Sequence, residues 1–199
     1  NCFLGVAKGS AEPPKLLVLH YKGKPESSGT DVALVGKGIT FDTGGVCLKP
    51  SKGMSSMKHD MGGAASVTST ILGAALTKAK CNLAVVVPLC ENHISGTAQK
   101  PGDVVKAMNG LTVEVEDTDA EGRLILADGL HFAQEQFKPA HLIDVATLTG
   151  AICVAVGPFA NGIYANNEEL WGSLEKGSKA AGDLSWRMPL WEDYNDLMK

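Results

Sequence analysis

Acidic and basic side chains gather in two separate segments of this sequence and could together form a catalytic site. Asp42 and Asp60 lie in a glycine-rich stretch at 36–63, and Asp119 and Glu121 follow later, two residues apart. Alternate residues of an extended chain point the same way, so Asp119 and Glu121 can present two carboxylates to one point. Clustered carboxylates raise one another's pKa unless a cation neutralises them. Two divalent ions about 3.5 to 4 Å apart form a hydrolytic centre in many enzymes.

Each charged residue also has a simpler explanation when it is taken alone. Asp60 and Glu121 can cap helix N-termini, where acidic side chains face the helix dipole. Lys37 alone is typical of a solvated charge at the end of a strand. Because Lys37, Lys49 and Arg123 share the two segments with the carboxylates, the whole set favours a site for zinc, manganese or magnesium.

Other catalytic motifs are incomplete or absent. Val35–Gly38 follows an apolar run, as a phosphate-binding P-loop does, but Asp31 stands where that motif requires glycine. Phe41 likewise stands where a dinucleotide fingerprint requires glycine. The sequence contains no HExxH or GxSxG motif, and its five histidines show no spacing typical of metal ligands.

Short apolar runs alternate with helix-length amphipathic segments, and this alternation must position the charged residues. It predicts an α/β fold with a mixed, largely parallel sheet and helices on both faces, a three-layer α/β/α arrangement. The expected strands are short and mostly β-branched or leucine-rich, at 16–21, 32–37, 83–89, 111–116, 142–147 and 152–156. The expected helices are 63–80, 121–137, 168–181 and 189 onward.

The composition indicates one soluble globular domain: 199 residues, 44% hydrophobic and 20% charged, with a formal net charge of −4. The longest uncharged run, 145–167, is interrupted by glycine and proline and predicts no membrane span. No two Lys or Arg residues are adjacent, so we expect neither nucleic acid nor anionic lipid as a partner. Five scattered cysteines without a CxxC pair favour reduced thiols in a cytosol-like compartment over a disulfide framework.

Several separated motifs resemble one known family. They are VGKGITFDTGG at 35–45, LKP at 48–50, MKHDMGGAA at 57–65, PLCEN at 88–92, DTDAEGRL at 117–124 and ATLTG at 146–150. In this order, and over essentially the whole chain, they look like the catalytic domain of the M17 leucyl aminopeptidases, the cytosol aminopeptidase family. The resemblance implies a zinc-peptidase-like α/β/α fold.

The resemblance also implies two divalent metal ions, zinc in general, with one ion exchangeable for manganese or magnesium. By motif, the tighter ion would be held by Lys37, Asp42, Asp60 and Glu121. The looser ion would be held by Asp42, Asp119 and Glu121. A lysine amine has a pKa of about 10.4, so the metal would have to hold Lys37 deprotonated.

The implied activity is removal of an N-terminal residue, preferably leucine or a similar apolar residue, from peptides. A metal-activated water would attack the first peptide carbonyl. Lys49 would supply positive charge to the oxyanion, and Arg123 would bind a bicarbonate that shuttles a proton. The pocket for the first side chain would be lined by Met57, Thr147, Leu148 and Gly150. Without the motif, Met57 is equally well explained as ordinary core.

The sequence departs from the family pattern in two ways. Asp117 stands where members usually carry Asn, and Thr43 stands where they usually carry Ser. Family members also have an N-terminal domain and a C-terminal continuation, so we expect 1–199 to be a metallopeptidase catalytic domain truncated at both ends. The family implies a cytoplasmic homo-hexamer acting on peptides. Two alternatives stay open: a catalytically silent member with a structural or binding role, and a Cys-Gly dipeptidase.

Overall fold

The computed structural model describes residues 1–198, and the chain divides after Leu148 into two compact units. The first unit contains every charged residue of the candidate site, and the second begins at Thr149. Among the described residues, no helix combines the length and the hydrophobicity that crossing a bilayer requires. The five cysteines are all free thiols.

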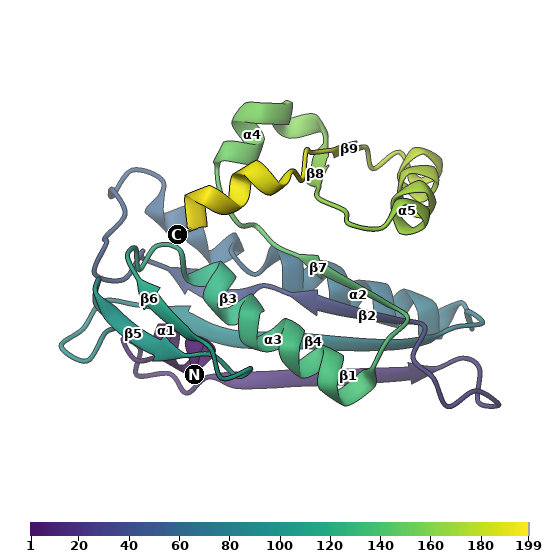
Figure 1. Cartoon of the computed structure of the whole chain (residues 1–199), viewed down its shortest axis with the longest axis horizontal. Helices are drawn as coiled ribbons and strands as arrows, with labels where there is room; N and C mark the ends of the chain where they lie inside the picture. Colours follow the sequence, from purple (N-terminus) through teal and green to yellow (C-terminus); the bar gives the residue numbers. More distant parts are fainter. Residues whose placement is uncertain (199) are drawn as a thin grey trace. The chain divides into compact units, whose positions relative to one another are not determined.

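A mixed sheet of five strands forms the centre of the first unit (Figure 1). Its order is β1 (Lys15–Lys22), β4 (Asn82–Asn92), β2 (Val32–Gly36) and β7 (His141–Val145), and β3 (Gly38–Asp42) also pairs with β4. Strands β2 and β3 run parallel to β4, and β7 runs parallel to β2, whereas β1 is antiparallel. The sheet is therefore mixed and largely parallel, as predicted.

Lys37 separates β2 from β3 without a change of register. The pairing with β4 has the same offset on both sides, which places Lys37 opposite Pro88. Pro88 has no backbone N–H, so the ladder has no donor at that residue. The backbone of Lys37 instead donates to Val145 O at 3.0 Å and accepts from Ala64 N at 2.9 Å. These bonds fix Lys37 at the carboxyl ends of the parallel strands.

Helices cover both faces of this sheet (Figure 1). Helix α2 (Gly62–Leu76) packs on one face, and α1 (Cys2–Ala7) and α3 (Glu121–Phe137) pack on the other. Successive residues of β4 alternate between the two cores, with Val85 on the α2 side and Val86 on the α3 side. Burial on both faces explains why β4 is a continuous apolar run, and the three layers confirm the predicted α/β/α arrangement.

Apart from α5 (Glu168–Ala181), the remaining elements are short. In the first unit they are the 3₁₀ helix η1 (Met54–His59) and an antiparallel hairpin of β5 (Asp103–Lys106) and β6 (Thr112–Val115). In the second unit they are α4 (Ala151–Val156), η2 (Gly157–Phe159), β8 (Asn161–Ile163), α5 (Glu168–Ala181), β9 (Ser185–Arg187) and η3 (Glu192–Met198). Strands β8 and β9 form a separate parallel pair.

One predicted strand is wrong. The apolar run 152–156 lies in helix α4, because an isolated run of this length fits a strand and a short helix equally well. The helices predicted at 121–137 and 168–181 have the observed bounds. The helix expected from 189 is a 3₁₀ helix over Glu192–Met198, and Lys199 lies outside the described residues. Helix α1 and strands β3, β5, β8 and β9 were not predicted.

Candidate metal centre

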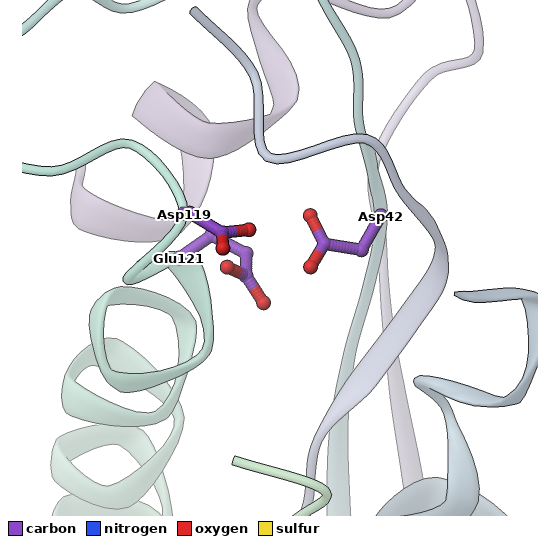
Figure 2. A group of neighbouring side chains, drawn as sticks. All are labelled: Asp42, Asp119 and Glu121. Atoms are coloured by element: carbon purple, nitrogen blue, oxygen red, sulfur yellow. The ribbon is translucent and has the colours of Figure 1, made fainter. Parts of the chain in front are cut away.

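Three carboxylates converge where the parallel strands of the first unit end. Asp42 is the last residue of β3, Asp119 lies in the turn before α3, and Glu121 is the first residue of α3. Figure 2 shows their carboxylates pointing toward one another, and one oxygen from each lies within 4.8 Å of the others. Asp42 and Glu121 are buried, and Asp119 is partly exposed. Carboxyl ends of parallel strands are the usual place for a ligand site in α/β folds.

Asp119 and Glu121 meet for a different reason from the one expected. The segment before α3 is a turn and not an extended strand. Asp117 Oδ1 accepts a hydrogen bond from Asp119 N at 2.8 Å, and Asp117 O accepts one from Ala120 N at 3.2 Å. This Asx turn, followed directly by the first helical residue, directs both carboxylates to the same side.

Lys37 lies between Glu121 and a fourth carboxylate, that of Asp60. Its Nζ is 2.7 Å from Glu121 Oε1 and 2.9 Å from Asp60 Oδ2, and it donates to Thr147 O at 3.0 Å. Burial alone would lower the pKa of Lys37, but the charges of Glu121 and Asp60 outweigh it and raise that pKa above its ordinary value. Burial also raises the pKa of Glu121 to about 7, although Lys37 opposes the shift.

Lys49 forms a second bridge on the other side of the cluster. Its Nζ is 2.8 Å from Asp42 Oδ2 and 2.5 Å from Asp119 Oδ1. Burial would lower the pKa of Lys49, but its bonds to Asp119 and Asp42 raise it. Burial raises the pKa of Asp119, and Lys49 only partly opposes this. Each lysine therefore stands between carboxylates as a cation.

The donor set fits divalent metal ions. Glu121 Oε2 is buried and has no hydrogen-bond partner among the described residues. Asp60 Oδ2 and Asp119 Oδ1 are buried beside lysines but accept no well-aligned hydrogen bond. The four carboxylates also carry two more formal negative charges than the two lysines balance. Buried oxygens with free lone pairs and excess negative charge are the ligands that hard and borderline divalent ions prefer.

Gly122 allows Lys37 to reach Glu121. A Cβ atom at position 122 would lie 2.8 Å from Lys37 Cε, 2.9 Å from Lys37 Nζ and 2.9 Å from Leu148 Cδ1. Real Cβ atoms essentially never show contacts this close, so a side chain there would make the ends of Lys37 and Leu148 shift. The glycine leaves room for the lysine, and its backbone angles do not require it.

Some of the other predicted site residues in the first unit lie at this cluster. Thr147 Oγ1 donates to Asp60 Oδ1 at 2.8 Å, and Leu148 lies beside Gly122. Met57 is half-buried in η1. Arg123 is exposed on the first turn of α3 and forms no ion pair with any described residue. Gly150 belongs to the second unit, where it directly precedes α4.

Two residues that support the cluster were not singled out from the sequence. Asn92 Nδ2 donates to Asp42 Oδ1 at 2.8 Å and to Thr118 O at 3.1 Å. Thr118 Oγ1 in turn donates to Gly44 O at 2.7 Å. Their partners lie 26 to 74 residues away in the chain, so no local spacing could have indicated these contacts.

Comparison with known proteins identifies close sequence relatives. Residues 1–199 match the catalytic domain of the cytosol aminopeptidase family. A probable cytosol aminopeptidase of Burkholderia thailandensis is 54% identical over 199 residues, which are 100% of this chain and 39% of that protein. The cytosol aminopeptidase of Xenopus tropicalis is 53% identical over 195 residues, 98% of this chain and 37% of that protein. The chain thus spans less than half the length of these relatives.

Solved structures show the same fold. The bottromycin maturation enzyme BotP is 36% identical, with a TM-score of 0.90 over 100% of this chain and 42% of that chain. The same enzyme in complex with Mn gives a TM-score of 0.92, covering 43% of that chain. The similarity therefore extends to a protein that binds manganese.

Proposed function

The chain belongs to the cytosol aminopeptidase family, and we propose that it forms the hydrolytic centre of an aminopeptidase that uses two divalent metal ions. One observation carries the proposal: oxygens of Asp42, Asp119 and Glu121 lie within 4.8 Å of one another, and a buried oxygen of Glu121 has no hydrogen-bond partner within residues 1–198. Such a cluster is stable when cations neutralise it.

The family resemblance supplies the proposed ligands. Asp42, Asp119 and Glu121 would hold one ion, and Lys37, Asp42, Asp60 and Glu121 would hold the other. Zinc is the expected metal, with manganese or magnesium able to replace it at the first position. When bound, the ions lower the pKa of a water and polarise the peptide carbonyl. Lys37 must lose its proton to become a ligand, so binding releases protons.

The chain's own residues would orient the substrate and stabilise charge. Lys49 is about one-fifth exposed, so its ammonium group can reach a substrate oxyanion, and such a donor is worth about 3 to 4 kcal/mol. Arg123 presents an exposed guanidinium, whose planar fork matches bicarbonate, the proposed proton shuttle. Met57, Thr147 and Leu148 would contact the first side chain and favour leucine or a similar apolar residue.

The activity is tested with the intact protein, Leu-p-nitroanilide and added Mn²⁺. We expect metal-dependent release of p-nitroaniline that stops on chelation. A protein that binds metal but gives no turnover would contradict the enzyme proposal and favour a structural or binding role. Comparison with Cys-Gly as substrate separates a leucyl aminopeptidase from a Cys-Gly dipeptidase.

The ligand assignment is tested by Asp60→Ala. Asp60 contributes only to the ion shared with Lys37, so this variant should lose that ion and keep the other. Elemental analysis should then find one bound ion per chain in the variant and two in the parent. Two ions in the variant would refute the assignment of Asp60.

We also propose a cytoplasmic homo-hexamer as the working form. The family resemblance supports this assembly, and five free thiols suit a reducing compartment. Light scattering on the intact protein tests it, because a hexamer has six times the mass of one chain. A monomeric mass at micromolar concentration would contradict the proposal.

A further inference from the structure

Asn92 occupies a central position behind the carboxylate cluster. It is the last residue of β4 and is only 4% exposed. Its side-chain nitrogen donates to Asp42 Oδ1 at 2.8 Å and to Thr118 O at 3.1 Å. An asparagine amide has two hydrogens to donate, and Asn92 donates to both of the segments that carry the carboxylates.

The bond to Asp42 decides how that carboxylate is oriented. Oδ1 accepts from Asn92 Nδ2 and also from Gly44 N at 2.9 Å. The other oxygen, Oδ2, remains on the cluster side, where it lies 2.8 Å from Lys49 Nζ. Asn92 therefore holds one oxygen of Asp42 away from the cluster and leaves the other available to a cation.

The bond to Thr118 holds the second segment, the turn before α3, next to the end of β4. Thr118 directly precedes Asp119, and its hydroxyl donates to Gly44 O at 2.7 Å and accepts from Cys47 N at 2.8 Å. The backbone oxygen of Asn92 accepts from Thr43 N at 3.0 Å. The end of β4 thus ties the loop after β3 to the turn before α3.

We propose that Asn92 is a positioning residue that sets the spacing between Asp42 and the pair Asp119 and Glu121, and so sets the affinity for divalent metal ions. This inference rests on the proposed metal-dependent function. Residues that orient metal ligands commonly change metal affinity by about 10- to 100-fold when they are removed. Asn92 itself touches neither metal nor substrate in this assignment.

The same strand offers a matched control. Asn82 is the first residue of β4, is 2% exposed, and donates from Nδ2 to Lys24 O, Ser27 O and Gly29 O. It is a buried asparagine at the opposite end of the strand and contacts no carboxylate of the cluster. Asn82→Ala removes comparable buried hydrogen bonds and so reports the general cost of such a change.

The test measures Mn²⁺ binding to the intact protein by calorimetry and by the EPR spectrum of the bound ion. We expect Asn92→Ala to bind Mn²⁺ about 10- to 100-fold more weakly, with an altered spectrum, because Asp42 can rotate. Asn82→Ala should unfold at a lower temperature yet bind Mn²⁺ with the parent affinity and spectrum. Asn92→Ser, which keeps one donor, should fall between the parent and Asn92→Ala, and it replaces Asn92→Ala if that variant does not fold.

Two results would overturn the inference while leaving the proposed metal centre intact. Parent-like Mn²⁺ affinity in both variants of Asn92 would show that the residue does not position the ligands. Equal weakening in the Asn82 and Asn92 variants would show only a general effect of lost stability. A parent protein that binds no Mn²⁺ would instead overturn the proposed metal centre, and the inference with it.

Discussion

Asp117 supports the cluster through the hydrogen bond that its side-chain oxygen accepts, more than through its negative charge. Its Oδ1 accepts the hydrogen bond from Asp119 N that forms the turn before α3, and an asparagine oxygen can accept the same bond. We expect Asp117→Asn to change the free energy of unfolding by no more than about 0.5 kcal/mol. Asp117→Ala removes the bond and should cost about 0.5 to 1.5 kcal/mol. Urea denaturation distinguishes the two, and equal losses would contradict this role.

The cysteines differ in their expected reactivity. Burial, with the nearby charges of Glu121 and Glu91, raises the pKa of Cys90 to about 12, whereas Cys153 is exposed. Only the thiolate reacts with iodoacetamide, so at pH 8 Cys153 should be alkylated rapidly and Cys90 only after unfolding. Peptide mass spectrometry of the native and the urea-unfolded protein measures this. Rapid labelling of Cys90 in the native protein would contradict its burial.

Two glycines of helix α2 give a matched test of packing at the scale of the element. A Cβ at Gly63 would lie 1.9 Å from Val145 O and 2.9 Å from Lys37 N, whereas a Cβ at Gly73 would meet nothing within 4 Å. Gly63→Ala should therefore displace the helix and cost about 1 to 3 kcal/mol. Gly73→Ala should stabilise the protein by about 0.5 to 1 kcal/mol. Urea denaturation of both variants tests this, and similar effects would refute the close packing of α2 against β7.

Elements with a long, consistent pattern were predictable from the sequence. Helix α3 begins at Glu121 and ends at Phe137 as its apolar spacing indicates, and most central strands follow from short apolar runs. Helix α4 was mistaken for a strand because a run of five apolar residues is too short to show either a helical or a strand periodicity. Strand β3 was missed because Lys37 and two glycines interrupt the apolar run, although the pairing with β4 keeps the same offset on both sides of Lys37.

The candidate site was predictable only in part. The charges in the glycine-rich segments indicated a metal site, and the structure brings Asp42, Asp119 and Glu121 together. The contacts of Asn92 and Thr118 were not predictable, because they depend on which strand ends are adjacent in the folded sheet. Such contacts join residues by tertiary structure and leave no spacing in the sequence.

The negative charge of the carboxylate cluster affects the stability of the whole molecule. The chain has a formal net charge of −4, and the four carboxylates of the cluster carry two more formal negative charges than Lys37 and Lys49 balance. Lys37 and Lys49 reduce this repulsion but leave Glu121 with a buried oxygen that has no partner in the described part of the chain. Bound divalent ions would remove the remaining repulsion, so metal and folding should be coupled.

Removal of metal should therefore lower the melting temperature of the intact protein. An ion present at 100 times its dissociation constant stabilises the fold by about 2.7 kcal/mol, which corresponds to a Tm change of roughly 5 to 10 °C for a domain of this size. We expect this loss on treatment with EDTA and its recovery when Mn²⁺ is added. Asp42→Asn, which alters a ligand shared by both ions, should melt at the same temperature with and without EDTA. Elemental analysis must first confirm that EDTA has removed the ions. If the parent Tm is then unchanged, the cluster does not couple metal binding to folding.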